Sequence, residues 1–216
     1  MLHNNKYAFF DFDETIVSIK SMFAFKKALM EEQGLPHEAF ADFMDELMQR
    51  ANLFTRSEVN RWYYSTLKGI DAEFSAEVAV RWSQRIKRNI YIDSTCRKIH
   101  ELKNLGYQIV VVSGSAQFII SEFLKDLDIY HSLCSTPEVK NNIFTGDLIG
   151  EPVIGTQKRQ SILAFLHQMG VSSNEIIVVG DHISDLPMLE IANQAMVVNP
   201  DKQLKNIAQK NGWLEL

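Results

Sequence analysis

The stretch Tyr7-Ala8-Phe9-Phe10-Asp11-Phe12-Asp13-Glu14-Thr15 decides the fold of this chain. Four apolar residues are followed at once by two aspartates, Asp11 and Asp13, that stand one residue apart. An ionised carboxylate is costly to bury unless a cation or hydrogen bonds compensate its charge. A pair of them at the end of a buried strand therefore indicates a functional site rather than a structural role.

A second pair of aspartates follows another apolar run far along the chain. Ile176-Ile177-Val178-Val179-Gly180 leads into Asp181, and Asp185 comes four residues later. Ligand sites in open α/β sheets lie at the carboxyl ends of strands, so the two pairs are expected to meet. Carboxylate oxygens suit Mg²⁺, which also binds phosphate oxygens. The sequence therefore predicts a magnesium site for phosphoryl transfer.

Short runs that are apolar on both faces predict a parallel sheet covered by helices on both sides. These runs are Tyr7–Phe10, Gln108–Val112, Glu175–Val179 and Ala195–Val198. Apolar residues at helical spacing lie between them, around positions 99–105, 116–127 and 162–169. Alternating helices and strands predict an α/β fold with a doubly wound, Rossmann-like parallel sheet.

A long helical stretch separates the first two predicted strands. About 95 residues lie between them, whereas a crossover between parallel strands needs only about a dozen. Within it, Thr55-Arg56-Ser57-Glu58 has the form of a capping box. We therefore predict a helical cap domain at 17–89, inserted into an α/β catalytic core of 1–16 and 90–216. The cap is expected to lie over the site, where it could act as a lid.

A second, smaller insertion is expected between Pro137 and Gly155. Two adjacent asparagines, Asn141 and Asn142, stand there between strand-like residues. This pattern predicts a β-hairpin.

Composition and charge exclude several classes of protein. The chain has 216 residues, of which 46% are apolar and 23% charged, and a net charge of −5. It lacks a basic footprint for nucleic acid, and its net charge argues against an anionic membrane surface. No signal peptide or run of about 20 apolar residues is present, so we expect a cytoplasmic protein without membrane insertion. Cys96 and Cys134 are expected to be free thiols, and nothing indicates an oligomeric state.

Other residues supply chemistry that the aspartates lack. A carboxylate nucleophile splits phosphate ester hydrolysis into two easier steps, and a neighbouring carboxyl group can act as acid and base. Ser113-Gly114-Ser115 follows a predicted strand and offers a hydroxyl group and backbone N–H groups to a phosphate at the next helix start. Lys158 opens a predicted helix, where its ammonium could neutralise charge on the phosphoryl group.

In combination these motifs resemble a known family. In order along the chain they are Asp11-Phe12-Asp13-Glu14-Thr15, Ser113, Lys158 and Gly180-Asp181-x-x-Ser184-Asp185. They match the four motifs of the haloacid dehalogenase superfamily of hydrolases. The helical insertion after the first motif resembles subfamily IB, the phosphoserine-phosphatase-like branch. The resemblance implies a phosphatase, because dehalogenase members lack the second aspartate of the first motif.

The resemblance also implies a role for each motif residue. Asp11 would be the nucleophile, Asp13 the general acid and base, and Thr15 a support of the loop that carries them. The phosphate would be bound by Thr15, Ser113, Gly114 and Lys158. The Mg²⁺ cofactor would be bound by Asp11, the backbone carbonyl of Asp13, Asp181 and Asp185.

Departures from the branch's pattern concern the substrate. Phosphoserine phosphatases carry a glutamate nine residues after the nucleophile, and Lys20 stands there instead. A lysine repels an amine and favours an acidic or neutral substrate. Ser184 replaces the asparagine usual in the last motif, and Arg56 and Arg61 are candidates to reach the substrate from the cap. The cap's aromatic residues are expected mainly to form its own core.

Three functions fit this reading. The first is a magnesium-dependent phosphatase that hydrolyses a small-molecule phosphate monoester through an aspartyl-phosphate intermediate. The second is a phosphotransferase, which would use the same residues with an acceptor other than water. The third is a non-catalytic sensor of phosphate ligands, a reading that the presence of both Asp11 and Asp13 disfavours.

Overall fold

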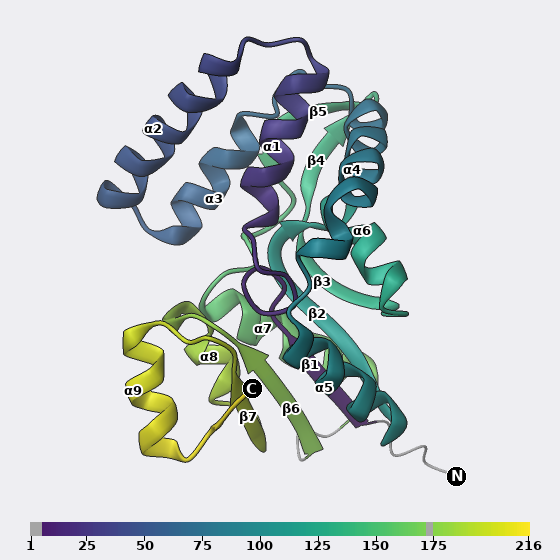
Figure 1. The fold of residues 1–216 in the computed structure, drawn as a ribbon, viewed down its shortest axis with the longest axis vertical. Helices are drawn as coiled ribbons and strands as arrows, with labels where there is room; N and C mark the ends of the chain where they lie inside the picture. Colours follow the sequence, from purple (N-terminus) through teal and green to yellow (C-terminus); the bar gives the residue numbers. More distant parts are fainter. Residues whose placement is uncertain (1–5, 172–174) are drawn as a thin grey trace.

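The computed structural model describes residues 6–171 and 175–216, and its centre is one six-stranded parallel sheet (Figure 1). The strand order is β3-β2-β1-β6-β7-β8, and every neighbouring pair is parallel. The strands are β1 (Lys6–Phe10), β2 (Tyr107–Ala116), β3 (His131–Ser135), β6 (Ile176–Gly180), β7 (Gln194–Val197) and β8 (Leu214–Glu215). The predicted α/β fold with a parallel sheet is confirmed.

Successive residues of β1 pack alternately into two separate apolar clusters, one on each face of the sheet. Tyr7 and Phe9 pack on the face that also holds Phe165, with ring centroids 5.2 and 5.9 Å from that residue. Ala8 and Phe10 point to the opposite face. This alternation follows from the two-residue period of a strand, and it explains why the strand reads as continuously apolar.

Helices of the α/β part cover both faces. They are α5 (Asp93–Asn104), α6 (Gln117–Asp126), α7 (Thr156–Gln168), α8 (Leu186–Leu189) and α9 (Lys202–Asn211), with short 3₁₀ turns η1 (Lys87–Asn89) and η3 (Ile183–Asp185). No helix among the described residues is both long enough and apolar enough to span a membrane.

Four helices that follow β1 form the predicted helical insertion, ahead of α5 and β2. They are α1 (Ser21–Glu32), α2 (His37–Leu53), α3 (Arg56–Ser65) and α4 (Ala72–Ile86), and Figure 1 shows them beyond the carboxyl end of the sheet. The capping box predicted at Thr55 and Glu58 is present at the start of α3. Helical spacing and the capping box predicted that this insertion and the crossovers of the sheet are helical, but they did not identify α1, α8 or α9 as separate elements.

The cap shares its apolar core with the sheet domain. Phe25 of α1 packs against Phe118 with ring centroids 5.5 Å apart, and Trp82 of α4 lies 5.7 Å from Phe123. Both partners belong to α6, on the far side of the predicted domain boundary. Opening α1 and α4 away from the sheet would expose these aromatic contacts, which opposes such a movement.

The predicted hairpin is present as β4 (Pro137–Lys140) and β5 (Ile143–Leu148). It pairs with the cap, because Ile143 forms a β-bridge with Asp71, and the Asn142 side chain donates to the Asp71 carboxylate at 2.8 Å. The Gly69 N–H also donates to the Phe144 carbonyl at 2.9 Å. The second insertion therefore supports the first, a contact that the sequence pattern did not predict.

Candidate active site

The carboxyl ends of β1 and β6 bring distant aspartates together. Asp11, Asp181 and Asp185 are buried, and each offers a carboxylate oxygen within 4.8 Å of those of the other two. The two strands are hydrogen-bonded neighbours, and the Asp11 N–H continues the ladder by donating to the Val179 carbonyl at 2.9 Å. The convergence therefore follows from strand order and register.

Lys158 bridges two of these carboxylates. Its ammonium lies 2.7 Å from Asp11 Oδ1 and 2.7 Å from Asp185 Oδ1, and the side chain is only 5% exposed. Burial by itself would lower the pKa of Lys158, but the two carboxylates outweigh burial and raise it above its usual value. The lysine is therefore held charged beside the Asp11 carboxylate.

Burial and neighbouring carboxylates raise the pKa of two of the aspartates. Burial raises the pKa of Asp11 well above its ordinary value, although Lys158 opposes the effect. Burial, together with the charge of Asp185, raises the pKa of Asp181 to about 6. Like charges at close range disfavour ionisation, and a bound cation would reverse this effect.

Asp185 and Thr15 hold the neighbouring site residues in place through hydrogen bonds. The second oxygen of Asp185 accepts hydrogen bonds from the backbone N–H groups of Asp181 and His182, both at 3.2 Å. A Cβ at position 180 would lie 2.9 Å from Asp185, which explains the glycine there. The Thr15 hydroxyl donates to Asp181 Oδ1 at 3.0 Å and does not line the cavity. The structure thus places Thr15 against the aspartate cluster rather than at the expected phosphate position.

Asp13 is oriented by two serines at the junction between cap and core. Its Oδ1 accepts from the backbone N–H of Ser21 at 2.7 Å, and its Oδ2 accepts from the Ser115 hydroxyl at 2.8 Å. The two serine hydroxyls also lie 2.8 Å apart. Burial raises the pKa of Asp13, and the hydrogen bonds from Ser21 and Ser115 oppose that shift. Sequence reasoning missed the role of Ser21, whose only signal is a buried hydroxyl in an apolar helix.

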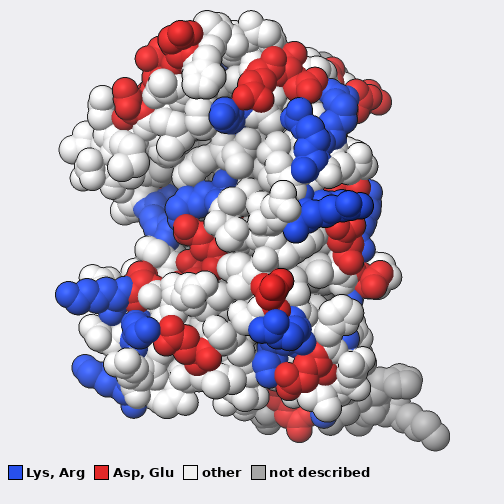
Figure 2. Space-filling model, in the orientation of Figure 1, with Lys and Arg blue, Asp and Glu red and all other residues white. Residues whose placement is uncertain are grey.

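A cavity of about 360 Å³ lies between the cap and the sheet. Figure 2 shows an indentation at this level, where Lys and Arg atoms lie beside Asp and Glu atoms. The predicted site residues that line the cavity are Asp11, Asp13, Lys20, Arg56, Ser113, Gly114, Lys158, Asp181 and Ser184. The predicted site residues outside its lining are Thr15, Arg61 and Asp185.

Ser113 and Gly114 lie within β2 rather than at a helix start, because the strand continues to Ala116. The Ser113 hydroxyl accepts from the Ser115 N–H at 3.0 Å, and the side chain is buried at the cavity. The Gly114 carbonyl accepts from the Tyr64 hydroxyl at 2.9 Å and from the Asn60 amide at 3.1 Å. Cap helix α3 is therefore hydrogen-bonded to the segment of β2 that was predicted to bind phosphate.

The predicted specificity residues differ in what they contact. Lys20 forms an ion pair with Glu14, which also lines the cavity, so part of its charge is compensated. Arg56 lines the cavity, and its charge adds to the effect of burial in lowering the pKa of His182. Arg61 instead pairs with Glu151 at 2.9 Å. Five residues along a helix correspond to a rotation of about 140°, which is why Arg56 and Arg61 cannot share the cavity.

The last motif folds into a compact turn after β6. The Ser184 N–H donates to His182 Nδ1 at 3.0 Å, and the Ser184 hydroxyl lies 3.2 Å from the same nitrogen. Both residues line the cavity, so His182 belongs to the site.

The aspartate cluster fits a divalent cation. Asp11, Asp181 and Asp185 carry three negative charges when ionised and Lys158 carries one positive charge, which leaves a net charge of −2. Carboxylate oxygens are the ligands that Mg²⁺ prefers. Asp11 and Asp181 also line the cavity, so a cation held there would be open to a ligand.

Comparisons with known proteins agree with this geometry. The family model of haloacid dehalogenase-like hydrolases matches residues 8–190. A phosphoserine phosphatase of Mycobacterium tuberculosis is 24% identical over 212 residues, covering 95% of this chain and 68% of the relative. A probable phosphatase of the same organism is 26% identical over 211 residues, covering 95% and 73% respectively.

Solved structures share the fold. A protein of unknown function from Bordetella pertussis Tohama I superposes with a TM-score of 0.90 at 20% identity, over 99% of this chain and 98% of the other. A phosphoserine phosphatase, solved as a phospho-aspartyl intermediate analogue, gives a TM-score of 0.68 at 23% identity, over 94% and 90%. The predicted likeness to the phosphoserine-phosphatase-like branch is therefore confirmed for the fold.

Proposed function

The chain belongs to the haloacid dehalogenase-like hydrolases, and on that premise we propose that it is a magnesium-dependent phosphatase of small-molecule phosphate monoesters. The observation that carries the proposal is the setting of Asp11. Its Oδ1 accepts from the Phe12 N–H at 2.7 Å and contacts the Lys158 ammonium, which leaves Oδ2 to react at the cavity. A fixed carboxylate beside a permanently charged lysine is a suitable nucleophile for an anionic ester.

The first step forms a bond between Asp11 Oδ2 and phosphorus as the ester P–O bond breaks. The leaving alkoxide takes a proton from the Asp13 carboxyl, whose pKa is raised by burial. In the second step the Asp13 carboxylate removes a proton from water, the water oxygen attacks phosphorus, and the bond to Asp11 breaks. The products are the alcohol and inorganic phosphate, and both aspartates return to their starting state.

The surrounding residues bind and orient the reacting groups. Ser113 and Lys158 line the base of the cavity and are proposed to bind the phosphate oxygens. Asp11, Asp181 and Asp185, with the Asp13 carbonyl, would hold Mg²⁺. When bound, the cation neutralises charge on the phosphoryl group. Thr15 and Asp185 keep Asp181 and Lys158 in place.

We do not propose phosphoserine as the substrate, although relatives are named phosphoserine phosphatases. Lys20 stands where phosphoserine phosphatases carry a glutamate, and its pairing with Glu14 leaves neither charge free to bind an amine. We therefore expect amine-bearing esters to be hydrolysed more slowly than neutral or acidic ones.

The test is turnover of a panel of phosphate esters by the Asp11→Asn variant, with phosphate release as the readout. We expect Mg²⁺-dependent release by the unaltered protein and a loss of at least about a thousandfold in the variant. Asp42→Asn, an exposed aspartate on α2 outside the cavity, is the matched control. Full activity of Asp11→Asn would refute the nucleophile. Alcohol acceptors added to the assay distinguish transfer to water from transfer to another hydroxyl group.

A further inference from the structure

We propose that the alcohol part of the substrate is apolar and is held by an apolar wall that the cap contributes to the cavity. The inference rests on the proposed function, because it concerns the leaving group of the ester. The base of the cavity carries the charged residues Asp11, Asp181 and Lys158. The cap contributes large apolar side chains to the same cavity, chiefly Met22, Phe23, Leu47, Met48, Phe54 and Val59. We call these six residues the apolar wall.

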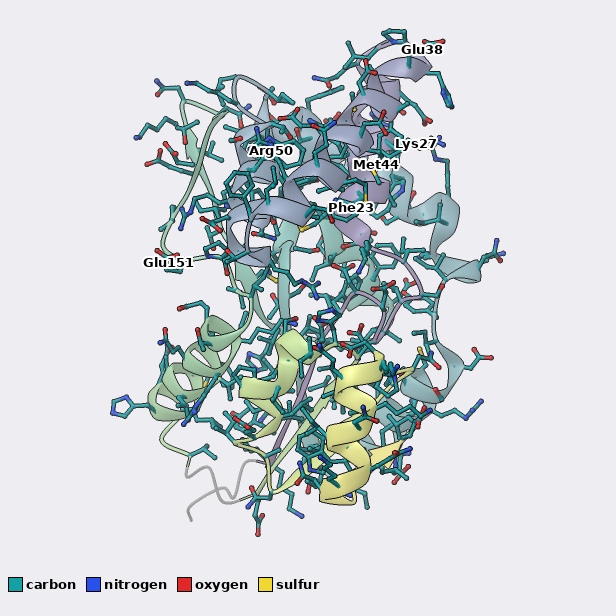
Figure 3. All side chains as sticks on the ribbon, turned by 90° about the vertical axis from the view of Figure 1, so that its left-hand side faces the viewer. Phe23, Lys27, Glu38, Met44, Arg50 and Glu151 are labelled. Atoms are coloured by element: carbon teal, nitrogen blue, oxygen red, sulfur yellow. The ribbon has the colours of Figure 1, made fainter. Side chains whose placement is uncertain are left out.

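Parts of the apolar wall are exposed, which the cap's own core does not explain. Met48 is 59% exposed and Phe54 is 48% exposed, while Leu47 next to Met48 is buried at 4%. Phe23, labelled in Figure 3, lies at the edge of the helical part that faces the sheet. Large apolar side chains kept beside a phosphate site are stabilised when a ligand covers them.

Apart from the Arg56 guanidinium, several hydrogen-bonding groups on the cap side are occupied by the protein itself. The Tyr63 hydroxyl donates to the Met22 carbonyl at 2.9 Å, and the Asn60 amide donates to the Gly114 carbonyl. Asn60 Oδ1 is the one buried acceptor there without a partner among the described residues. Glu14, a carboxylate of the lining, is already paired with Lys20.

These pairings disfavour a small leaving group that carries both an ammonium and a carboxylate, as an amino acid does. The ammonium of an amino-acid ester would lack a free carboxylate, and its polar backbone would lie against methionine and phenylalanine. An alkyl or aromatic leaving group would instead bury Met48 and Phe54 as it binds. The cavity volume of about 360 Å³ lies near the lower end of the range for small-molecule sites, so the substrate is a compact molecule.

A series of straight-chain alkyl phosphates from ethyl to hexyl tests the inference. Each methylene that enters an apolar site should raise kcat/KM about threefold to fourfold, so hexyl phosphate should exceed ethyl phosphate about a hundredfold. Phosphoserine should fall below hexyl phosphate. A flat series, or phosphoserine as the better substrate, would overturn the inference.

Variants of the apolar wall localise the effect. Met48→Ser and Phe54→Ser alter exposed side chains and should each reduce kcat/KM for hexyl phosphate about tenfold, a loss that shrinks as the alkyl chain shortens. Leu53→Ser is the matched control, because Leu53 is adjacent and 76% exposed but does not line the cavity. Equal losses in Leu53→Ser and Phe54→Ser would contradict the assignment of the wall.

A binding measurement separates this inference from the proposed function. Should the unaltered protein hydrolyse none of the esters, the proposed function fails, and calorimetry on Asp11→Asn with Mg²⁺ still tests the wall. Hexyl phosphate should bind at least tenfold more tightly than ethyl phosphate. Equal affinities would reject the apolar leaving group whether or not the protein is a phosphatase.

Discussion

Lys26 on α1 offers a quantitative test of the cap's interior. Its side chain is 5% exposed, and its ammonium donates to the Thr66 carbonyl at 3.0 Å and lies 5.7 Å from the centre of the Phe43 ring. Among the described residues no carboxylate lies within ion-pair distance of it. Burial lowers the pKa of Lys26 from 10.5 to about 8. The charged lysine therefore destabilises the folded state at neutral pH.

The pH range and the size of the effect follow from the two pKa values. Below about pH 8 the lysine is protonated in both states, and the cost of burying the charge is fully present. Between about pH 8 and 10.5 the unfolded chain holds more protons than the folded one, so stability rises with pH. At about 1.4 kcal/mol per tenfold change in proton affinity, the gain in stability from pH 7 to pH 10 is about 2–3 kcal/mol.

Lys26→Met isolates this contribution in urea unfolding at several pH values. The free energy of unfolding of the variant minus that of the unaltered protein should fall by about 2–3 kcal/mol from pH 7 to pH 10. The lost bond to Thr66 changes the offset of this difference but not its dependence on pH. Lys27→Met, at the neighbouring exposed lysine, should show a nearly constant difference. A difference for Lys26→Met that stays level across this range would refute the buried charge.

Three further predictions concern the site. Ser115→Ala removes the hydrogen bond from the serine hydroxyl to Asp13 and should lower kcat about tenfold with little change in KM. In steady-state kinetics, a change confined to KM would argue against a positioning role. Gly114→Ala places a Cβ 3.0 Å from Ile154 and 3.1 Å from Asn60, and should lower the free energy of unfolding by about 1–3 kcal/mol. An unchanged Tm would show that these two side chains can move aside. Mg²⁺ at about a hundredfold over its Kd should stabilise the protein by about 2.7 kcal/mol, and EDTA should abolish turnover. If Mg²⁺ stabilised the Asp181→Asn variant equally, the cation would bind elsewhere.

The sheet and the aspartate cluster were predictable because their signals are local and strong. Strands apolar on both faces must be central, and carboxylates at their ends must lie at one edge of the sheet. Asp11 and Asp181 therefore lie at the same edge, and the pairing of β1 with β6 brings them together. The edge strands β3 and β8 were missed, since β3 is half polar and β8 has two residues.

The cap side of the site was less predictable because helical periodicity identifies a face but not its partner. Phe54 and Leu53 are adjacent apolar residues at the end of α2, yet only Phe54 lines the cavity. Arg56 and Arg61 read alike as helix arginines, and the partner of Arg61 is Glu151, 90 residues away. Such choices depend on how α3 meets the loop before α7, which no local pattern encodes.

The hydrogen bonds of Asp13 tie the proposed proton transfer to the position of the cap. Its Oδ1 is bound by the first N–H group of α1, where the partial positive charge of a helix start also favours a carboxylate. Its Oδ2 is bound by Ser115 at the end of β2, which belongs to the sheet. The carboxyl group thus spans the junction, so a shift of α1 relative to β2 must break one of the two bonds. Since the contacts of Phe25 and Trp82 with α6 oppose such a shift, the acid and base would be oriented before substrate arrives.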